Sequence, residues 1–241
     1  MSGNNENNFI NQLSIDCVIF GYNQKKLKVL ISKLNFKGDF WTLPSGFIFQ
    51  EESIDQAAHR ILEERTGIYD IYLEQYRVFG EVPRTNISIV KKLLELNQEK
   101  FDKFEFNNFT FDWLTSRFIA IGYYALVDIE KVVPKLMKID QSIDWYNINE
   151  LPPMIMDHNE QVFKALETLR IGLDNKLLGF NLLPEKFTMK ELQQLYEAVY
   201  DIPLRRNNFQ KKMLNLGVLE RLEKKFTGAA NKAPYLYKFK L

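Results

Sequence analysis

Residues 46–68 read GFIFQEESIDQAAHRILEERTGI, and this stretch decides the fold of the first domain. Ser53 and Gln56 have the spacing of a capping box, which predicts a helix that begins at Ile54. Apolar residues recur at helical spacing and give this helix one buried face; they are Ile54, Ala57, Ala58, Ile61 and Leu62. Gly67 is expected to end the helix, because glycine readily adopts the left-handed conformation found at helix C-termini.

The segments around this helix predict a mixed α/β domain that covers residues 1–175. Short runs rich in β-formers predict its strands, at 15–20, 28–34, 40–47, about 71–79, about 118–127 and about 142–146. A helix at roughly 158–171 closes the domain. Residues 85–116 form an insertion whose first half has helical periodicity. A connection of this length usually forms a lid, a partner surface or a mobile loop.

The opening stretch resembles the signature of the Nudix hydrolases, G-x5-E-x7-R-E-U-x-E-E-x-G-U, where U is an aliphatic residue. The positions that match are Gly46, Glu52, Arg60, Leu62, Glu64, Gly67 and Ile68. The resemblance implies a magnesium ion held by the glutamate after the arginine and by the final glutamate pair. Ile61 and Arg65 stand at two of these three positions, and only Glu64 remains.

These two replacements predict a Nudix domain without metal-dependent catalysis. Ile61 and Arg65 are four residues apart and share a helix face, so two carboxylates are lost and a cation is gained there. Magnesium needs several oxygen ligands to offset its dehydration. We therefore expect no catalytic residue, no bound metal and no cofactor. Arg65 either pairs with an acidic neighbour or presents a fixed positive charge to a ligand.

Residues 180–241 predict a second domain of the winged helix-turn-helix type. Thr188 and Glu191 form a second capping box ahead of a helix, and Pro203 suits the first position of the next helix, at 204–216. Two short strands around a loop follow, which completes the order helix, turn, basic helix and wing. From Leu204 onward the charge balance is +8, although the whole chain carries only +1. This asymmetry is compatible with a polyanion as the partner of the second domain and equally with a solvated basic surface.

The basic helix at 204–216 has the side chains that read and hold DNA. Phe209, Met213 and Leu216 form its predicted apolar face, and Asn207 and Lys211 lie opposite. Asn and Gln can pair with adenine, and basic side chains contact phosphates. The complete set of candidate DNA contacts is Arg205, Arg206, Asn207, Asn208, Gln210, Lys211, Lys212, Lys225 and Lys232. The alternative is a solvated basic helix in a protein-binding domain.

Several stretches resemble the Nudix-related transcriptional regulators of bacteria. They are FGYNQKKLKVLISK, WTLPSGF, IGYYALV, WYNINELPPMIMDH, GFNLLPEKFTMKELQQLYEAVY, NNFQKKM and LYKF. This resemblance implies an α/β (α+β) Nudix sandwich that senses a metabolite, followed by a C-terminal winged helix-turn-helix that binds operator DNA as a homodimer. One branch of that family senses ADP-ribose-type nucleotides, and another, in the Bacteroidetes, resembles arabinose-utilisation regulators. The stretch RILEERTGI, which lacks the metal glutamates, looks more like the second branch.

We therefore expect a transcriptional regulator that responds to a sugar such as L-arabinose or to a related metabolite. The candidate effector-binding residues are Phe47, Arg65, Glu81, Arg84, Arg117, Asp157 and His158. A sugar site needs planar or charged hydrogen-bonding groups, often beside an aromatic face. One alternative is an active metal-dependent Nudix pyrophosphatase with an ADP-ribose-like substrate and a nucleic-acid-binding appendage. Another is a protein-binding adaptor that uses the insertion.

Composition limits the compartment and the partners. Apolar residues make up 46% of the chain, yet no apolar run reaches the ~18 residues of a membrane span. The polar N-terminus lacks the features of a signal peptide, and the single cysteine, Cys17, can form neither an internal disulfide nor a zinc cluster. We expect a cytoplasmic protein whose partners are double-stranded operator DNA and a small sugar or nucleotide, with no membrane contact.

Overall fold

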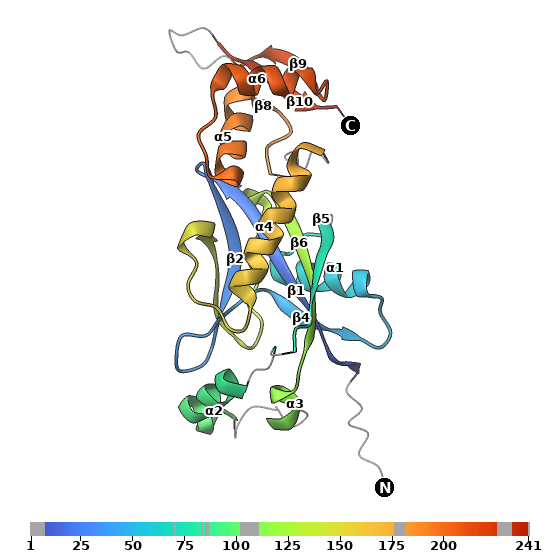
Figure 1. Ribbon diagram of the computed structural model, residues 1–241, viewed down its shortest axis with the longest axis vertical. Coiled ribbons are helices and arrows are strands. Elements are labelled where there is room, and N and C mark those ends of the chain that lie inside the picture. The colour runs from blue at the N-terminus through green and yellow to red at the C-terminus, as the bar shows by residue number, and fades with distance from the viewer. Residues whose placement is uncertain are drawn as a thin grey trace.

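The computed structural model describes residues 8–69, 71–82, 84, 87–101, 111–175, 182–225 and 233–240. The molecule is elongated, with a sheet domain in the middle and a smaller helical domain at the C-terminal end (Figure 1). The two helices of the insertion lie at the opposite end. Among the helices described, none is both long enough and apolar enough to span a bilayer.

A seven-stranded mixed sheet forms the centre of the first domain. Its main path is β3 (Trp41–Thr42), β2 (Lys26–Leu34), β1 (Phe9–Asn23), β6 (Ile119–Val127) and β5 (Tyr72–Phe79). In addition, β4 (Ser45–Phe49) pairs with β1, and β7 (Asp140–Asn147) pairs with β2. The strand predicted at 40–47 is therefore two strands. Pro44 separates them because it has no N–H for a ladder, and its carbonyl instead accepts from the N–H of Cys17 at 2.8 Å.

Helix α1 (Ile54–Thr66) covers one face of this sheet. Its capping box is present as predicted, and Gly67 ends it in the left-handed region with φ of 73°. Ile61 and its apolar neighbours on the helix are buried against β1 and β6. Ile54 was predicted to belong to this face but is 40% exposed.

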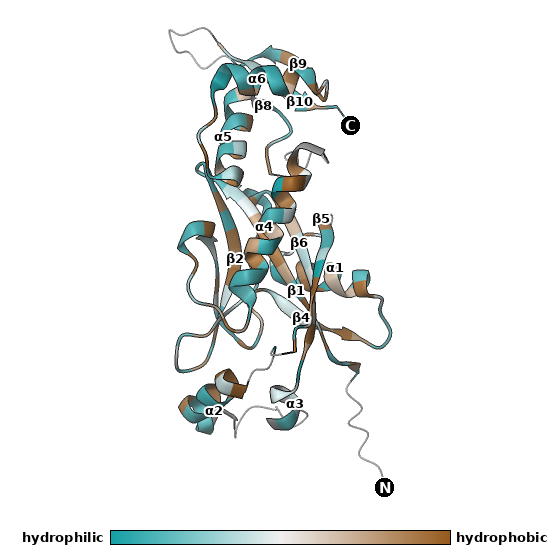
Figure 2. Ribbon diagram, viewed as in Figure 1, coloured by the Kyte–Doolittle hydropathy of each residue, from teal (hydrophilic) through white to brown (hydrophobic). Residues whose placement is uncertain are grey.

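Helix α4 (His158–Asn175) covers the other face and is four residues longer than the 158–171 prediction. Alternation along β1 explains the two layers. Ile15 and Cys17 pack with α1, whereas Val18 and Phe20 pack with α4. The hydropathy colouring shows the apolar strands between these helices (Figure 2).

The insertion contains α2 (Ile87–Phe101), with a kink at Asn97, and α3 (Phe111–Thr115). The helical periodicity predicted for its first half is confirmed. Asn97 anchors α2 to the sheet domain, since its side chain accepts from the N–H of Lys37 at 2.6 Å and donates to the Lys37 carbonyl at 3.1 Å. The insertion is therefore docked on the first domain through α2.

The second domain is a winged helix. Its elements are β8 (Phe187–Thr188), α5 (Met189–Tyr200), α6 (Arg206–Asn215), β9 (Leu219–Lys224) and β10 (Tyr235–Phe239). The three strands form a sheet in the order β8-β10-β9. The predicted capping box of Thr188 and Glu191 starts α5. Two details of the prediction were wrong: Pro203 lies in the turn, because α6 begins only at Arg206, and Leu216 is 42% exposed past the end of that helix.

The two domains share one apolar core, which runs from the sheet through α4 into α5. Hydrogen bonds reinforce this junction. Arg170 Nε donates to the carbonyl of Val199 at 2.8 Å, and the Tyr200 hydroxyl donates to the carbonyl of Arg170 at 2.9 Å. The C-terminal half of α4 is thus attached to the first helix of the winged helix domain.

Candidate functional site

Three charged side chains of the opening stretch, those of Glu52, Arg60 and Glu64, contact one another. Arg60 Nε donates to Glu52 at 2.9 Å, and its Nη2 donates to the carbonyl of Phe47 at 2.8 Å. The same guanidinium lies 3.3 Å from Glu64. The hydrogen bond from Arg60 lowers the pKa of Glu52 below its usual range, despite the opposing effect of burial. Arg60 therefore ties the loop before α1 to the helix.

Ile61 and Arg65, which stand at two metal-ligand positions of the Nudix signature, are both buried. Ile61 is 1% exposed, and a Cβ placed on Gly46 would lie 2.8 Å from Ile61 Cγ1. Arg65 is buried and forms an ion pair with Asp140, which is itself buried at the start of β7. These residues do not fit a magnesium ion, because the remaining carboxylates already neutralise arginines. Among the residues that the structure describes, no group of three or more His, Cys, Asp or Glu side chains is arranged to hold a metal.

A cluster of polar side chains lies on the α4 face of the sheet. Arg84 Nε donates to Asp157 at 2.8 Å, its Nη1 donates to the carbonyl of Phe118 at 3.1 Å, and its Nη2 donates to Asp16 at 3.2 Å. Gln161 Nε2 donates to Asp16 at 2.7 Å and to Asp157 at 2.9 Å. We call Asp16, Arg84, Asp157, Gln161 and His158 the polar cluster.

The access of solvent differs within the polar cluster. The Asp157 side chain is 23% exposed, whereas those of Arg84 and Asp16 are nearly buried. Burial alone would raise the pKa of Asp157, but the hydrogen bonds from Arg84 and Gln161 hold that pKa below its usual value. Gln161 Oε1 is buried and has no hydrogen-bond partner among the described residues. Asp157 is therefore the member of the cluster that solvent or a ligand can reach.

His158 belongs to the cluster as a neutral side chain. Its Nδ1 accepts from the N–H of Leu43 at 3.1 Å and lies 3.2 Å from the Thr42 hydroxyl. Burial lowers the pKa of His158, against the raising effect of Asp16 and Asp157. Because Nδ1 is an acceptor, the ring proton is on Nε2, which is 3.7 Å from Asp16.

An aromatic group adjoins the polar cluster. The rings of Phe9 and Phe47 stack with centroids 4.9 Å apart, and Trp113 of α3 contacts Phe118 edge to face at 4.8 Å. Trp113 also lies 5.5 Å from Phe47. We call Phe9, Phe47, Trp113 and Phe118 the aromatic wall. The wall meets the polar cluster at Phe118, whose carbonyl binds Arg84.

The structure brings some of the predicted effector residues together and separates others. Arg84, Asp157 and His158 share the polar cluster, and Phe47 lies in the adjoining wall. Arg65 does not join them, because it is buried on the α1 face against Asp140. Two other predicted residues lie at the surface: Glu81 is exposed, and Arg117 donates to the carbonyl of Gly80.

Sequence reasoning missed Asp16, Gln161 and Trp113. Asp16 is an acid within the apolar run SIDCVIF, and a charge inside a buried strand is a signal that it has a partner. Gln161 follows Asp157 by four residues, so the two share a helix face. No local pattern predicts the position of Trp113, because its ring contacts come from β1, from β4 and from Phe118, the residue before β6.

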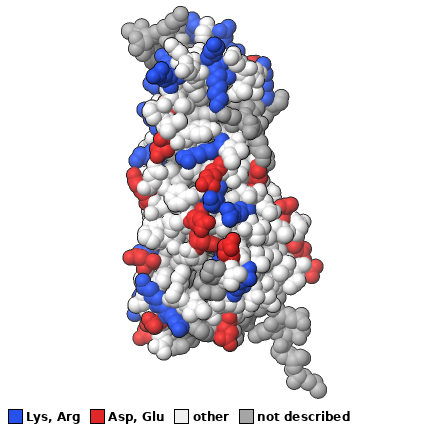
Figure 3. All heavy atoms as spheres, in the orientation of Figure 1, with Lys and Arg blue, Asp and Glu red and all other residues white. Residues whose placement is uncertain are grey.

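The candidate nucleic-acid interface is the outer face of α6. Phe209 and Met213 are buried against α5, and Asn207 and Lys211 are exposed on the opposite side. Other predicted contacts that are exposed are Arg205, Arg206, Asn208, Lys212 and Lys225, while Gln210 is half-buried. Lys and Arg side chains gather at this end of the molecule (Figure 3). Lys232 lies outside the described residues.

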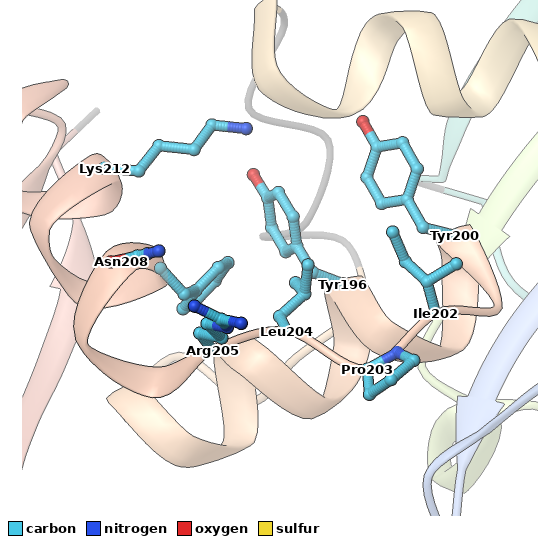
Figure 4. A pocket seen from close by; sticks show the side chains of 9 residues that line it. Tyr196, Tyr200, Ile202, Pro203, Leu204, Arg205, Asn208 and Lys212 are labelled. Atoms are coloured by element: carbon cyan, nitrogen blue, oxygen red, sulfur yellow. The ribbon is translucent and has the colours of Figure 1, made fainter.

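A groove of about 430 Å³ lies beside α6, at the turn that connects it to α5. It is lined by Tyr196, Tyr200, Ile202, Pro203, Leu204, Arg205, Asn208, Phe209 and Lys212. The hydroxyls of Tyr196 and Tyr200 point toward the neighbouring helix (Figure 4), where they donate to carbonyls of α4. The groove therefore adjoins the contact between α4 and the winged helix.

Comparison with known proteins supports both domains. The NUDIX domain model matches residues 11–166, and the model of the NrtR DNA-binding winged helix domain matches residues 179–239. A protein from Acinetobacter baylyi described as the ADPR responsive transcriptional repressor NtrR is 26% identical over 236 residues, which cover 95% of this chain and 82% of that protein.

Solved structures agree on the fold. NrtR from Shewanella oneidensis, in a crystal structure with a 27mer DNA, has a TM-score of 0.69 and 23% identity, over 95% of this chain and 94% of that one. A MutT/nudix family protein from Enterococcus faecalis has a TM-score of 0.68 and 18% identity, over 96% and 87% of the two chains. The chain therefore belongs to the Nudix family and joins a Nudix domain to a winged helix DNA-binding domain of the NrtR type.

Proposed function

We propose that this protein is a transcriptional repressor that binds operator DNA through α6 and the wing, and whose Nudix domain binds an ADP-ribose-type effector instead of hydrolysing it. The observation that carries the proposal is the ion pair of Arg65 with Asp140, which closes the region of the Nudix signature in a chain that also has a DNA-binding domain. The repressor from Acinetobacter baylyi, which is named as ADPR-responsive, supports the effector class.

The polar cluster and the aromatic wall support the effector site. A ligand rich in hydroxyls can donate to the partly exposed Asp157, while a flat ring can pack on the wall. The ribose hydroxyls and adenine ring of ADP-ribose have this chemistry. A free pentose such as L-arabinose presents similar hydroxyls and is the second candidate effector. Only a small part of the Asp157 side chain is exposed, which suits a ligand as small as a pentose.

Helix α4 connects the proposed effector site to the winged helix domain. Its first turns carry His158 and Gln161, and its later turns bind α5 through Arg170. Its 18 residues span about 27 Å at ~1.5 Å per residue. An effector that changes the hydrogen bonds of the polar cluster thus acts on the same rigid helix that supports the winged helix, which gives a route for coupling.

We further propose domain limits of 1–175 and 180–241 and a homodimeric state. Winged helix regulators commonly place one recognition helix in each of two half-sites about one helical turn of DNA apart, roughly 34 Å. One chain carries one α6, so reading both halves of a palindromic operator requires a second copy.

The test uses the full-length protein and a duplex selected from a random DNA pool. Fluorescence anisotropy should show binding that weakens as salt increases, and Arg206→Ala with Lys211→Ala should reduce both the affinity and the salt slope. ADP-ribose should release the DNA, and no hydrolysis product should form when magnesium is added. Metal-dependent turnover of ADP-ribose, or an unchanged salt slope in the double variant, would contradict the proposal. Release by L-arabinose alone would identify the second candidate as the effector.

A further inference from the structure

Besides the outer face of α6, the winged helix domain contains the groove of about 430 Å³ at the turn between α5 and α6. Tyr196 and Phe209, only 3% and 5% exposed, form its base, and Leu204 is half-buried beside them. Ile202 lies at its edge and is 52% exposed. The groove is therefore mostly apolar, and its volume is within the roughly 300–1,000 Å³ that is usual for small-molecule sites.

The charges of the groove have one sign. The described residues that line it include two cations, Arg205 and Lys212, and no Asp or Glu. The Lys212 ammonium lies 5.8 Å from the centroid of the Tyr196 ring, and its side chain extends toward the Tyr196 hydroxyl (Figure 4). Asn208, which is exposed, adds an amide that can donate or accept a hydrogen bond. An anionic group at the edge of the groove thus meets positive charge and no carboxylate among the lining residues.

The groove occupies one side of α6, and the outer side is a different set of residues. Asn208 and Lys212 are four residues apart and share the side that lines the groove, and Arg205 directly precedes the helix. Asn207 and Lys211 are also four apart, but they share the outer side, and neither lines the groove. Three of the candidate DNA contacts therefore belong to the groove as well.

We propose that this groove is a second ligand site, which binds an amphipathic anion: an apolar ring or chain that carries a single carboxylate. The apolar part packs against Ile202, Leu204 and the base of the groove, and the carboxylate accepts hydrogen bonds from Arg205. Burial of the apolar part supplies affinity, and the guanidinium, whose geometry matches a carboxylate, fixes the orientation. The site is separate from the effector site proposed for the Nudix domain, because none of its lining residues belongs to the polar cluster or the aromatic wall.

Calorimetry on the full-length protein, without DNA or effector, tests the proposal with three probes. 2-Naphthoate has an apolar ring and a carboxylate, 2-naphthalenemethanol has the same ring without the charge, and acetate has the carboxylate alone. We expect 2-naphthoate to bind, the alcohol to bind about tenfold more weakly, and acetate not to bind measurably. The result is independent of the proposed function, because the measurement involves neither ADP-ribose nor DNA.

Two exposed positions locate the bound probe, and their exposure means that the variants should keep the fold. Arg205→Gln should weaken 2-naphthoate binding about tenfold and change the affinity for the alcohol little, whereas Ile202→Ser should weaken both about threefold. The matched controls are Arg221→Gln, at an exposed arginine on β9, and Leu136→Ser, at a leucine of the first domain that is 56% exposed. Neither control residue lines the groove, so both variants should bind 2-naphthoate as the wild type does.

DNA binding provides a second readout, and this one rests on the proposed function. Because Arg205, Asn208 and Lys212 are also candidate DNA contacts, 2-naphthoate should release the duplex in fluorescence anisotropy, and Arg205→Gln should require about tenfold more of it. No binding of 2-naphthoate, equal binding of the alcohol, or binding unchanged in both Arg205→Gln and Ile202→Ser would overturn the proposal. Binding in calorimetry without release of the duplex would support the ligand site and refute its overlap with the DNA contacts.

Discussion

Arg65 and Arg84 lie on opposite faces of the same sheet, and each is buried against carboxylate groups. Arg65, on the α1 face, pairs with Asp140, whose side chain is 0% exposed. Arg84, on the α4 face, pairs with Asp16 and with Asp157, whose side chain is 23% exposed. The buried oxygens without a partner among the described residues include Asp140 Oδ1 on the first face and Gln161 Oε1 on the second.

The difference in exposure makes the Arg65 pair a structural ion pair and the surroundings of Arg84 a candidate binding site. The pair on the α1 face is sealed, so it can hold α1 against the start of β7 but cannot meet a ligand without unfolding locally. The α4 face has a carboxylate that solvent reaches and rings beside it. This Nudix domain thus has a reachable polar site on its α4 face, and the later turns of α4 bind the winged helix domain.

The largest effect is expected from Asp140→Ala. This change leaves the buried Arg65 without its partner, and unpaired buried charges typically cost about 3–5 kcal/mol. Urea unfolding should show this loss in the free energy of unfolding. The double change Arg65→Met with Asp140→Leu should recover most of it, because it removes both charges. A loss below ~1 kcal/mol in Asp140→Ala would show that the α1 face is open to water.

A second effect on the α1 face is steric. Gly46→Ala places a methyl group 2.8 Å from Ile61 Cγ1, and overpacking of this kind typically costs about 1–3 kcal/mol. Adding Ile61→Val to Gly46→Ala should restore part of the stability, which thermal unfolding of the two variants would reveal. If the single change is neutral, Ile61 does not fill the space between α1 and β4.

Much of this architecture can be predicted from local sequence, and the reasons are physical. Capping boxes and Gly67 depend on contacts within a few residues, so Ser53 and Thr188 locate both helix starts correctly. Arg84, Asp157 and His158, three of the predicted effector residues, lie together in the polar cluster, and their role in effector binding stays a prediction. Local sequence does not predict which side chains pair across long sequence separations.

The two arginines illustrate that limit. Arg65 was expected either to pair with an acidic neighbour or to present its charge to a ligand, and its buried ion pair with Asp140, 75 residues away, agrees with the first of these. Pro203 and Leu216 show the same limit in the second domain. The turn between α5 and α6 is longer than the residue pattern indicates, which leaves Pro203 outside α6, and α6 ends at Asn215, just before Leu216.

On the α4 face, Asp157→Asn should lower the free energy of unfolding less than the changes on the α1 face do. It should weaken effector binding more than they do. The partly exposed carboxylate should contribute about 1–2 kcal/mol, because Asp16 still pairs with Arg84. The pKa of Asp157 is depressed, so its contribution is present above the ordinary value of 3.8 and is lost as pH falls through the lower folded value. Acid unfolding followed by circular dichroism should show this loss in wild type and not in the variant. Effector affinity that survives Asp157→Asn would place the ligand elsewhere.

The smallest effect is expected from His158. It should be measurable as a change in the free energy of unfolding with pH. The folded pKa lies below 6.5 because the ring is buried, although Asp16 and Asp157 oppose this and Arg84 supports it. Below pH 6.5 the unfolded chain therefore binds a proton that the folded chain does not, so stability falls by about 1 kcal/mol between pH 7 and ~5.5. His158→Asn keeps an acceptor for the Leu43 N–H but cannot titrate, and it should flatten the slope in urea titrations. An unchanged slope would mean that His158 ionises inside the fold, and the α4 face would then carry a pH-dependent charge that the sealed α1 face lacks.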